Sequence, residues 1–240
     1  MFIMMNPYMM GGFDSTYMIY LIIALTIPAL AQGFLSSTFN KYRQVRSSSG
    51  ITGAQVARKI LDSNGLYDVT LAEVPGKLSD HYDPRHKAVR LSRDIYQGNS
   101  IASLAVAAHE CGHAIQDAKA YAPLKFRSAM FPLVNIANKF GYLAIMIGLI
   151  AGIMDFATIG VVLIGIVVLF QLVTLPVEFN ASTRAVRQLD DLNVFYSPEE
   201  KTGARKVLTA AALTYVAGAI VALAELARWV IILNRRNNRR

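Results

Sequence analysis

The chain has 240 residues, of which 54% are hydrophobic and 17% are charged, and its mean hydropathy is +0.37. A soluble domain would usually have about 25% charged residues, so the composition argues against a wholly soluble protein and indicates membrane segments joined to a small polar part. The single cysteine excludes an internal disulfide framework. Basic residues beside membrane segments explain the net charge of +8, so we expect a lipid bilayer as partner and no nucleic acid.

Residues 1–39 are predicted to hold an N-terminal transmembrane anchor. No charged residue occurs from Thr16 to Phe39, and residues 17–35 can cross a bilayer core, which takes about 20 residues. We interpret this segment as an anchor and not as a signal peptide that is removed, because no basic residues precede it and no convincing cleavage site follows it. The basic residues that follow are Lys41, Arg43, Arg46, Arg58 and Lys59. The positive-inside rule therefore places the next region in the cytoplasm.

Residues 40–132 are predicted to form a catalytic region. Residues 52–64 have the apolar spacing of an amphipathic helix, and residues 69–74 and 88–92 have the composition and alternation of strands. If residues 88–92 form an edge strand, they can pair with an extended peptide substrate. An ordinary structural strand is the alternative.

The motif His109-Glu110-Cys111-Gly112-His113 has the HExxH pattern. A helix is predicted around it, with Asn99 or Ser100 as N-cap, and residues four apart share one helix face. The two imidazoles can therefore hold one zinc ion, and Glu110 can act as the base that activates a zinc-bound water. Two histidines on an exposed helix would be the structural alternative.

Two further residues of this motif carry structural expectations. Cys111 is turned away from the face of the histidines, so we interpret it as a buried free thiol. Gly112 costs about 1 kcal/mol against alanine inside a helix, which indicates that another element packs closely there.

Residues 133–175 are predicted to form a transmembrane hairpin with a tight turn at Asp155, and residues 176–206 are polar. Residues 207–240 form a last hydrophobic helix with a basic tail. Glu225 and Arg228 interrupt this helix, where they can pair with each other or snorkel at the interface. With the N-terminus outside, four crossings would return the C-terminal tail to the outside, whereas the arginines of the tail favour the cytoplasm. Either the last segment does not fully cross, or the orientation assigned from the first segment is wrong.

A third zinc ligand must come from outside the motif. The metzincin pattern needs a histidine six residues after His113, but Lys119 stands there. Glu178 is the favoured ligand, because it begins a predicted helix directly after the hairpin, which returns the chain to the side of the zinc helix. The other acids considered are Asp117, which could also hold a second-shell hydrogen bond, Asp155, Asp190 and Asp191.

The order of anchor, HECGH, hydrophobic hairpin and Glu178-Phe-Asn-Ala-Ser182 resembles the membrane gluzincin peptidases of the HtpX and Ste24 kind. Together with residues 79–84 and 88–92, these motifs resemble the YugP-type putative neutral zinc metallopeptidases over nearly the whole chain. The resemblance implies His109, His113 and Glu178 as ligands of one zinc ion per chain and Glu110 as the general base. Where the wider gluzincin pattern has an aspartate that orients a zinc histidine, this chain has Ser182. Asn180, Ser182 and Asp117 are the candidates for that role.

The sequence thus predicts a mostly α-helical membrane protein with about four hydrophobic helices and a small α+β zincin-like catalytic part. We expect a zinc-dependent endopeptidase of the bacterial cell membrane, acting on membrane or membrane-adjacent polypeptides from the cytoplasmic side. His81, Tyr82 and Arg184 are candidates for contacts with the oxyanion or substrate, although turn chemistry also explains residues 79–84 and Arg184 can pair locally. The rival hypotheses are an inactive zinc-binding scaffold and a channel or transporter.

Overall fold

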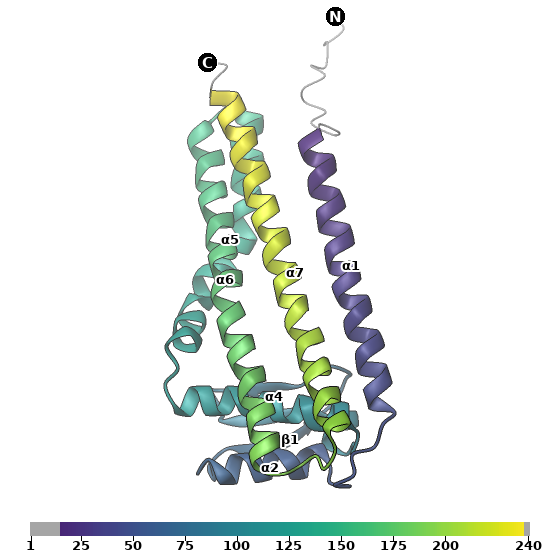
Figure 1. The fold of residues 1–240 in the computed structure, drawn as a ribbon. Helices are drawn as coiled ribbons and strands as arrows, with labels where there is room; N and C mark the ends of the chain where they lie inside the picture. Colours follow the sequence, from purple (N-terminus) through teal and green to yellow (C-terminus); the bar gives the residue numbers. More distant parts are fainter. Residues whose placement is uncertain (1–14, 238–240) are drawn as a thin grey trace, which may run out of the picture. The chain divides into compact units, whose positions relative to one another are not determined.

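The computed structural model describes residues 15–237 and is mostly helical, which confirms the predicted fold class (Figure 1). The start of the predicted anchor and Arg239 and Arg240 of the tail lie outside the described residues. The elements, in chain order, are α1 (Ser15–Arg43), α2 (Gly53–Ser63), β1 (Thr70–Val74), β2 (His81–Asp83), β3 (Ala88–Ser92), α3 (Arg93–Tyr96), α4 (Ile101–Ala118), α5 (Ala122–Ala151), α6 (Met154–Asp191) and α7 (Pro198–Asn237).

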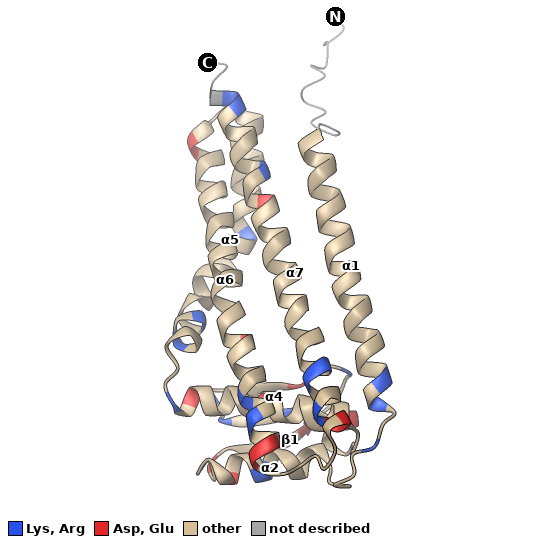
Figure 2. Cartoon of the chain, viewed as in Figure 1, with Lys and Arg blue, Asp and Glu red and all other residues tan. Residues whose placement is uncertain are grey.

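Four of these helices, α1, α5, α6 and α7, are long and apolar enough to cross a membrane. Their middle parts carry few charged residues (Figure 2). The chain turns between α5 and α6 at Gly152, whose φ of +72° suits glycine, so the turn falls just before the predicted Asp155. The helix after the turn is unbroken from the apolar segment through Glu178.

The contacts divide the chain into two compact units, described separately. Of the described residues, the membrane unit comprises residues 15–30, 132–171 and 217–237. The HExxH unit comprises residues 31–131 and 172–216.

Glycines bring α5 and α6 together inside the membrane unit. A Cβ added at Gly148 would lie 2.3 Å from the backbone nitrogen of Ala157, and one at Gly160 would lie 2.5 Å from the carbonyl oxygen of Gly141. Small residues allow this close approach of helix backbones in a bilayer, where it maximises van der Waals contact.

The two charged residues of the membrane part of α7 interact with aromatic side chains. Tyr142 of α5 donates a hydrogen bond to Glu225. The guanidinium of Arg228 lies 4.3–5.3 Å from the centres of three aromatic rings, those of Tyr17, Tyr20 and Trp229. Among the described residues no ion pair joins Glu225 to Arg228, so the hypothesis that they pair is wrong. Aromatic faces supply the attraction that a carboxylate would otherwise give.

The end of α7 lies beside the end of α5, where the Nη1 of Arg236 donates to the carbonyl oxygen of Leu149 at 3.3 Å. The last helix therefore reaches the same end of the membrane unit as the α5–α6 turn.

The HExxH unit contains a three-stranded sheet with the order β1-β3-β2. β3 pairs in parallel with β1 and antiparallel with β2. The prediction that residues 88–92 could offer a free edge is therefore wrong, because the three-residue β2 within the turn-rich stretch covers that side. Its central place makes β3 an ordinary structural strand.

Two capped helices pack on this sheet and form the core of the HExxH unit. α2 begins at a capping box, in which Thr52 and Gln55 each accept a hydrogen bond from the other's backbone N–H. Ser100 caps α4 by accepting from the N–H of Ser103 at 3.1 Å, as predicted. Apolar side chains of both helices are fully buried with those of β3; among them are Val56, Ile60, Leu61, Val89, Leu91 and Leu104.

Candidate metal centre

α4 presents His109 and His113 from one face. Their ring centres lie 4.8 Å apart at an interplanar angle of 86°. The spacing of four residues puts the side chains one above the other on a helix, and most of the remaining surface of α4 is buried in the core. A buried helix limits the positions open to its side chains, so the two imidazoles are well fixed.

Gly112, between the two histidines, allows α6 to lie directly against α4. A Cβ at Gly112 would be 2.6 Å from the carbonyl oxygen of Ala181. The expectation of a close neighbour at this glycine is confirmed. The contact brings Glu178, one helical turn before Ala181, next to the histidines.

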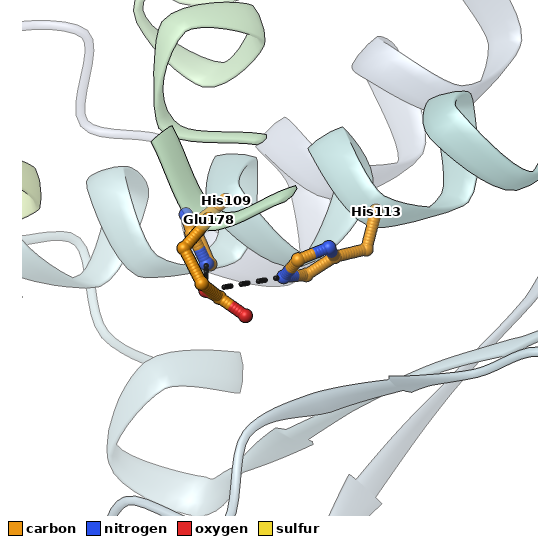
Figure 3. A group of neighbouring side chains, drawn as sticks. All are labelled: His109, His113 and Glu178. Carbon is orange, nitrogen blue, oxygen red and sulfur yellow. Dashed lines mark ion pairs between the residues drawn. The ribbon is translucent and has the colours of Figure 1, made fainter. Parts of the chain in front are cut away.

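Figure 3 shows the carboxylate of Glu178 between the two imidazoles. Its Oε2 lies 3.3 Å from the Nε2 of His109 and 3.6 Å from the Nε2 of His113. One ligand atom from each residue falls within 4.8 Å of the others. Two atoms bound to a tetrahedral zinc at about 2.0–2.1 Å lie roughly 3.3 Å apart. The two distances from Glu178 to the histidines are close to this value, and all three ligand atoms lie within 4.8 Å of one another.

The burial of Glu178 and the missing hydrogen bond of its Oε2 also support a metal site here. Its side chain is only 3% exposed, and its Oε2 is buried without a hydrogen bond in the described structure. A buried carboxylate oxygen normally has a hydrogen-bond or metal partner. Two imidazole nitrogens and one carboxylate oxygen form the donor set of many catalytic zinc sites, so the residues present fit this ion.

Each imidazole is held by a second side chain through Nδ1. Ser182 places its Oγ 3.2 Å from the Nδ1 of His109, and Gln116 places its Oε1 3.0 Å from the Nδ1 of His113. When the proton of each imidazole is on Nδ1 and is donated in a hydrogen bond to these oxygens, each Nε2 is free to bind a metal. Ser182 was a predicted candidate, whereas Gln116 was missed, although its position three residues after His113 was a local signal.

Gln116 belongs to a buried network that also holds the part of α6 around Glu178. Its Nε2 donates to the carbonyl oxygen of Val177 at 2.8 Å and to the Oδ1 of Asn180 at 3.0 Å. Arg184 donates from Nε to the same Oδ1 at 2.7 Å. Asn180 therefore acts through Gln116, and Arg184 pairs locally on its own helix, as one of the two predictions for it stated.

A second residue that the sequence did not indicate is Arg127, near the start of α5. Its Nη1 lies 3.1 Å from the Oε1 of Glu178. Glu178 thus has one oxygen at an arginine and the other between two histidines. The fold brings three helices together here, and no local spacing relates residue 127 to residue 178.

Neighbouring carboxylates change the pKa of His113. Burial by itself would lower the pKa of this histidine, because it disfavours the charged form. The nearby carboxylates of Glu178 and Glu110 outweigh burial and raise the pKa above its ordinary value. Glu110 is itself buried, with 8% of its surface exposed.

The predicted alternatives for the third ligand and the oxyanion contact have other partners. Asp117 accepts a hydrogen bond from the hydroxyl of Tyr82 at 2.9 Å, and burial, with this bond, raises the pKa of Tyr82. His81 is exposed and places Nδ1 2.7 Å from the carbonyl oxygen of Ser79, which is turn chemistry. Their hydrogen bonds therefore do not involve the three candidate metal ligands.

Cys111 faces the core, as predicted. It is fully buried, and its Sγ lies 3.6 Å from the carbonyl oxygen of Ala57 on α2. Burial raises the pKa of the thiol well above its ordinary value. The cysteine of the HECGH motif therefore contributes packing between α2 and α4.

Comparison with known proteins shows the family of this chain. The family model described as "Putative neutral zinc metallopeptidase" matches residues 17–234. The chain belongs to this family. Its similarity to the "Putative membrane protease YugP" of Bacillus subtilis (strain 168) is 48% identity over 223 residues, which cover 90% of this chain and 99% of that protein. No solved structure matches. The resemblance drawn from the motifs is confirmed, and membership of the family implies zinc as the metal.

Proposed function

We propose that this chain is a zinc-dependent endopeptidase that hydrolyses peptide bonds of membrane or membrane-adjacent proteins. The observation that carries the proposal is the arrangement of His109, His113 and Glu178, with ligand-atom separations suited to one zinc ion and Glu110 beside the first histidine. Family membership supports the reaction class, and four apolar helices support a substrate close to the bilayer.

In this proposal the three ligands hold the metal through the Nε2 atoms of the histidines and the Oε2 of Glu178. When bound, zinc would polarise the scissile carbonyl and make water more acidic. The carboxylate of Glu110 accepts the proton of the attacking water and returns it to the leaving amine. Ser182 and Gln116 keep the Nδ1 protons of the histidines in place, so that Nε2 remains the metal-binding nitrogen.

We also propose that the HExxH unit faces the cytoplasm of a bacterial cell. The basic residues Lys41, Arg43 and Arg46 follow the first apolar segment, and Arg58 and Lys59 follow on the next helix. Positive charge near the ends of membrane segments favours the cytoplasmic side. The arginines of the C-terminal tail oppose this assignment, with four charges against five: Arg235, Arg236, Arg239 and Arg240.

The test compares full-length wild type with Glu110→Gln, both purified in detergent. Zinc per chain and cleavage of casein are measured on the same samples. We expect one zinc ion in both proteins and cleavage by the wild type alone, because glutamine leaves the ligands intact but cannot accept a proton. Zinc in both proteins with equal cleavage would refute the role of Glu110, and a wild type without zinc would refute the proposed site.

A further inference from the structure

The two carboxylate oxygens of Glu178 have different neighbours, Arg127 at one oxygen and the two histidines at the other. Its Nη1 lies 3.1 Å from Oε1, and Oε2 is left between the histidines without a hydrogen bond. The side chain of Glu178 is 3% exposed and that of Arg127 is 22% exposed. The pair is therefore largely removed from water, where a charged hydrogen bond fixes geometry more firmly than on the surface.

This division affects how Glu178 can bind a metal. A carboxylate with both oxygens free can rotate about its last bond or offer both oxygens to one ion. An arginine on one oxygen restricts the rotation and leaves a single oxygen for the metal. Partners of metal ligands typically change metal affinity by about 10–100-fold when they are removed.

We propose that Arg127 is a positioning residue for the metal centre, which holds Glu178 as a ligand through one oxygen only. The inference rests on the proposed zinc site, but it concerns how the chain prepares that site and not the hydrolysis itself. It also assigns a role to the beginning of α5, which follows the zinc helix after three residues. The chain thus supplies the metal histidines and the partner of the third ligand from two successive helices.

The experiment measures zinc affinity of the full-length protein in detergent by competition with a chromophoric chelator. The variants are Arg127→Ala, Arg127→Gln and Arg127→Lys, with Lys125→Ala as control, since Lys125 is an exposed cation on the same helix. We expect zinc affinity to fall about 10–100-fold in the alanine and glutamine variants. The lysine variant should be intermediate, because it keeps the charge but not the planar fork of the guanidinium, and the control should match wild type.

A second measurement reports coordination directly. The visible absorption spectrum of the cobalt-substituted protein depends on the number of ligand atoms, so it should change in Arg127→Gln and stay unchanged in Lys125→Ala. Circular dichroism identifies any variant that fails to fold. If the alanine and glutamine variants do not fold, the comparison of Arg127→Lys with wild type decides whether Arg127 positions Glu178.

The outcomes separate this inference from the proposed function. Equal or tighter zinc binding in the folded Arg127 variants, with the wild-type cobalt spectrum, would overturn the role of Arg127 alone. Tighter binding would mean that repulsion between arginine and metal outweighs positioning. A wild-type protein that binds no zinc would instead refute the proposed site.

Discussion

Replacing Gly112 with alanine tests whether the contact between α4 and α6 determines the metal centre. The added Cβ would lie 2.6 Å from the carbonyl oxygen of Ala181, whereas real Cβ atoms essentially never come closer than 3.0 Å. The two helices must therefore separate by about 0.4 Å or more. Metal–ligand distances tolerate only about 0.2 Å, and Glu178 moves with the helix that is displaced.

Two opposing energies act on this variant. Alanine is better than glycine in a helix by about 1 kcal/mol, and overpacking typically costs about 1–3 kcal/mol. The net loss of folding stability is thus about 0–2 kcal/mol. The backbone of Ala181 and not a flexible side chain stands in the way, so the clash cannot be relieved by a change of rotamer. We expect a larger effect on zinc affinity, a loss of at least about tenfold, since the ligands are on the two helices that separate.

The assay is chelator competition together with thermal unfolding of the full-length protein. Gly165→Ala is the matched control, because Gly165 lies on α6 and an added Cβ there meets no atom within 4 Å. This control should bind zinc like wild type. If Gly112→Ala also bound zinc with wild-type affinity, the close approach of the two helices would not position the site, and the reasoning would be refuted.

Two further predictions concern the partners of the motif residues. Ser182→Ala should weaken zinc binding about tenfold, because the Nδ1 of His109 loses its acceptor. Ser182→Asp should restore the zinc affinity, because its carboxylate is a stronger, charged acceptor. Equal zinc affinities in wild type and Ser182→Ala would show that the contact between Ser182 and His109 does not affect metal binding. Cys111 should react with a maleimide on the order of a thousandfold more slowly in the folded protein than in denaturant, because the thiol is buried and its raised pKa suppresses the thiolate. Labelling at the same rate under both conditions would contradict the observed packing.

The sequence predicted those features that depend on short-range patterns. The spacing of His109 and His113, the N-cap Ser100 and the inward-facing Cys111 all follow from helix periodicity, and the structure has them as predicted. Glu178 required a longer argument, from the hairpin that returns the chain, and the structure places it beside both histidines.

Long-range partners were harder to predict. Arg127 was not identified, because its contact with Glu178 depends on the packing of α5 against α6. The edge-strand alternative for β3 was wrong, and the alternative of an ordinary structural strand was right. The sequence could not decide between them because β2 has three residues, too few to stand out within a turn-rich stretch. Pairing of Glu225 with Arg228 was one of two expectations from their spacing on one helix, but a tyrosine hydroxyl and aromatic rings, mostly from other helices, are their partners.

The continuity of α6 has a consequence for handling the protein. This helix has 38 residues, a rod of about 57 Å, and no loop separates its apolar part from Glu178. Pro176 removes one hydrogen bond two residues before the ligand, so bending is easiest there. One continuous helix thus joins an apolar segment that is long enough to cross a membrane to a residue of the candidate metal centre. The lipid or detergent should therefore be kept the same whenever the zinc affinities of variants are compared.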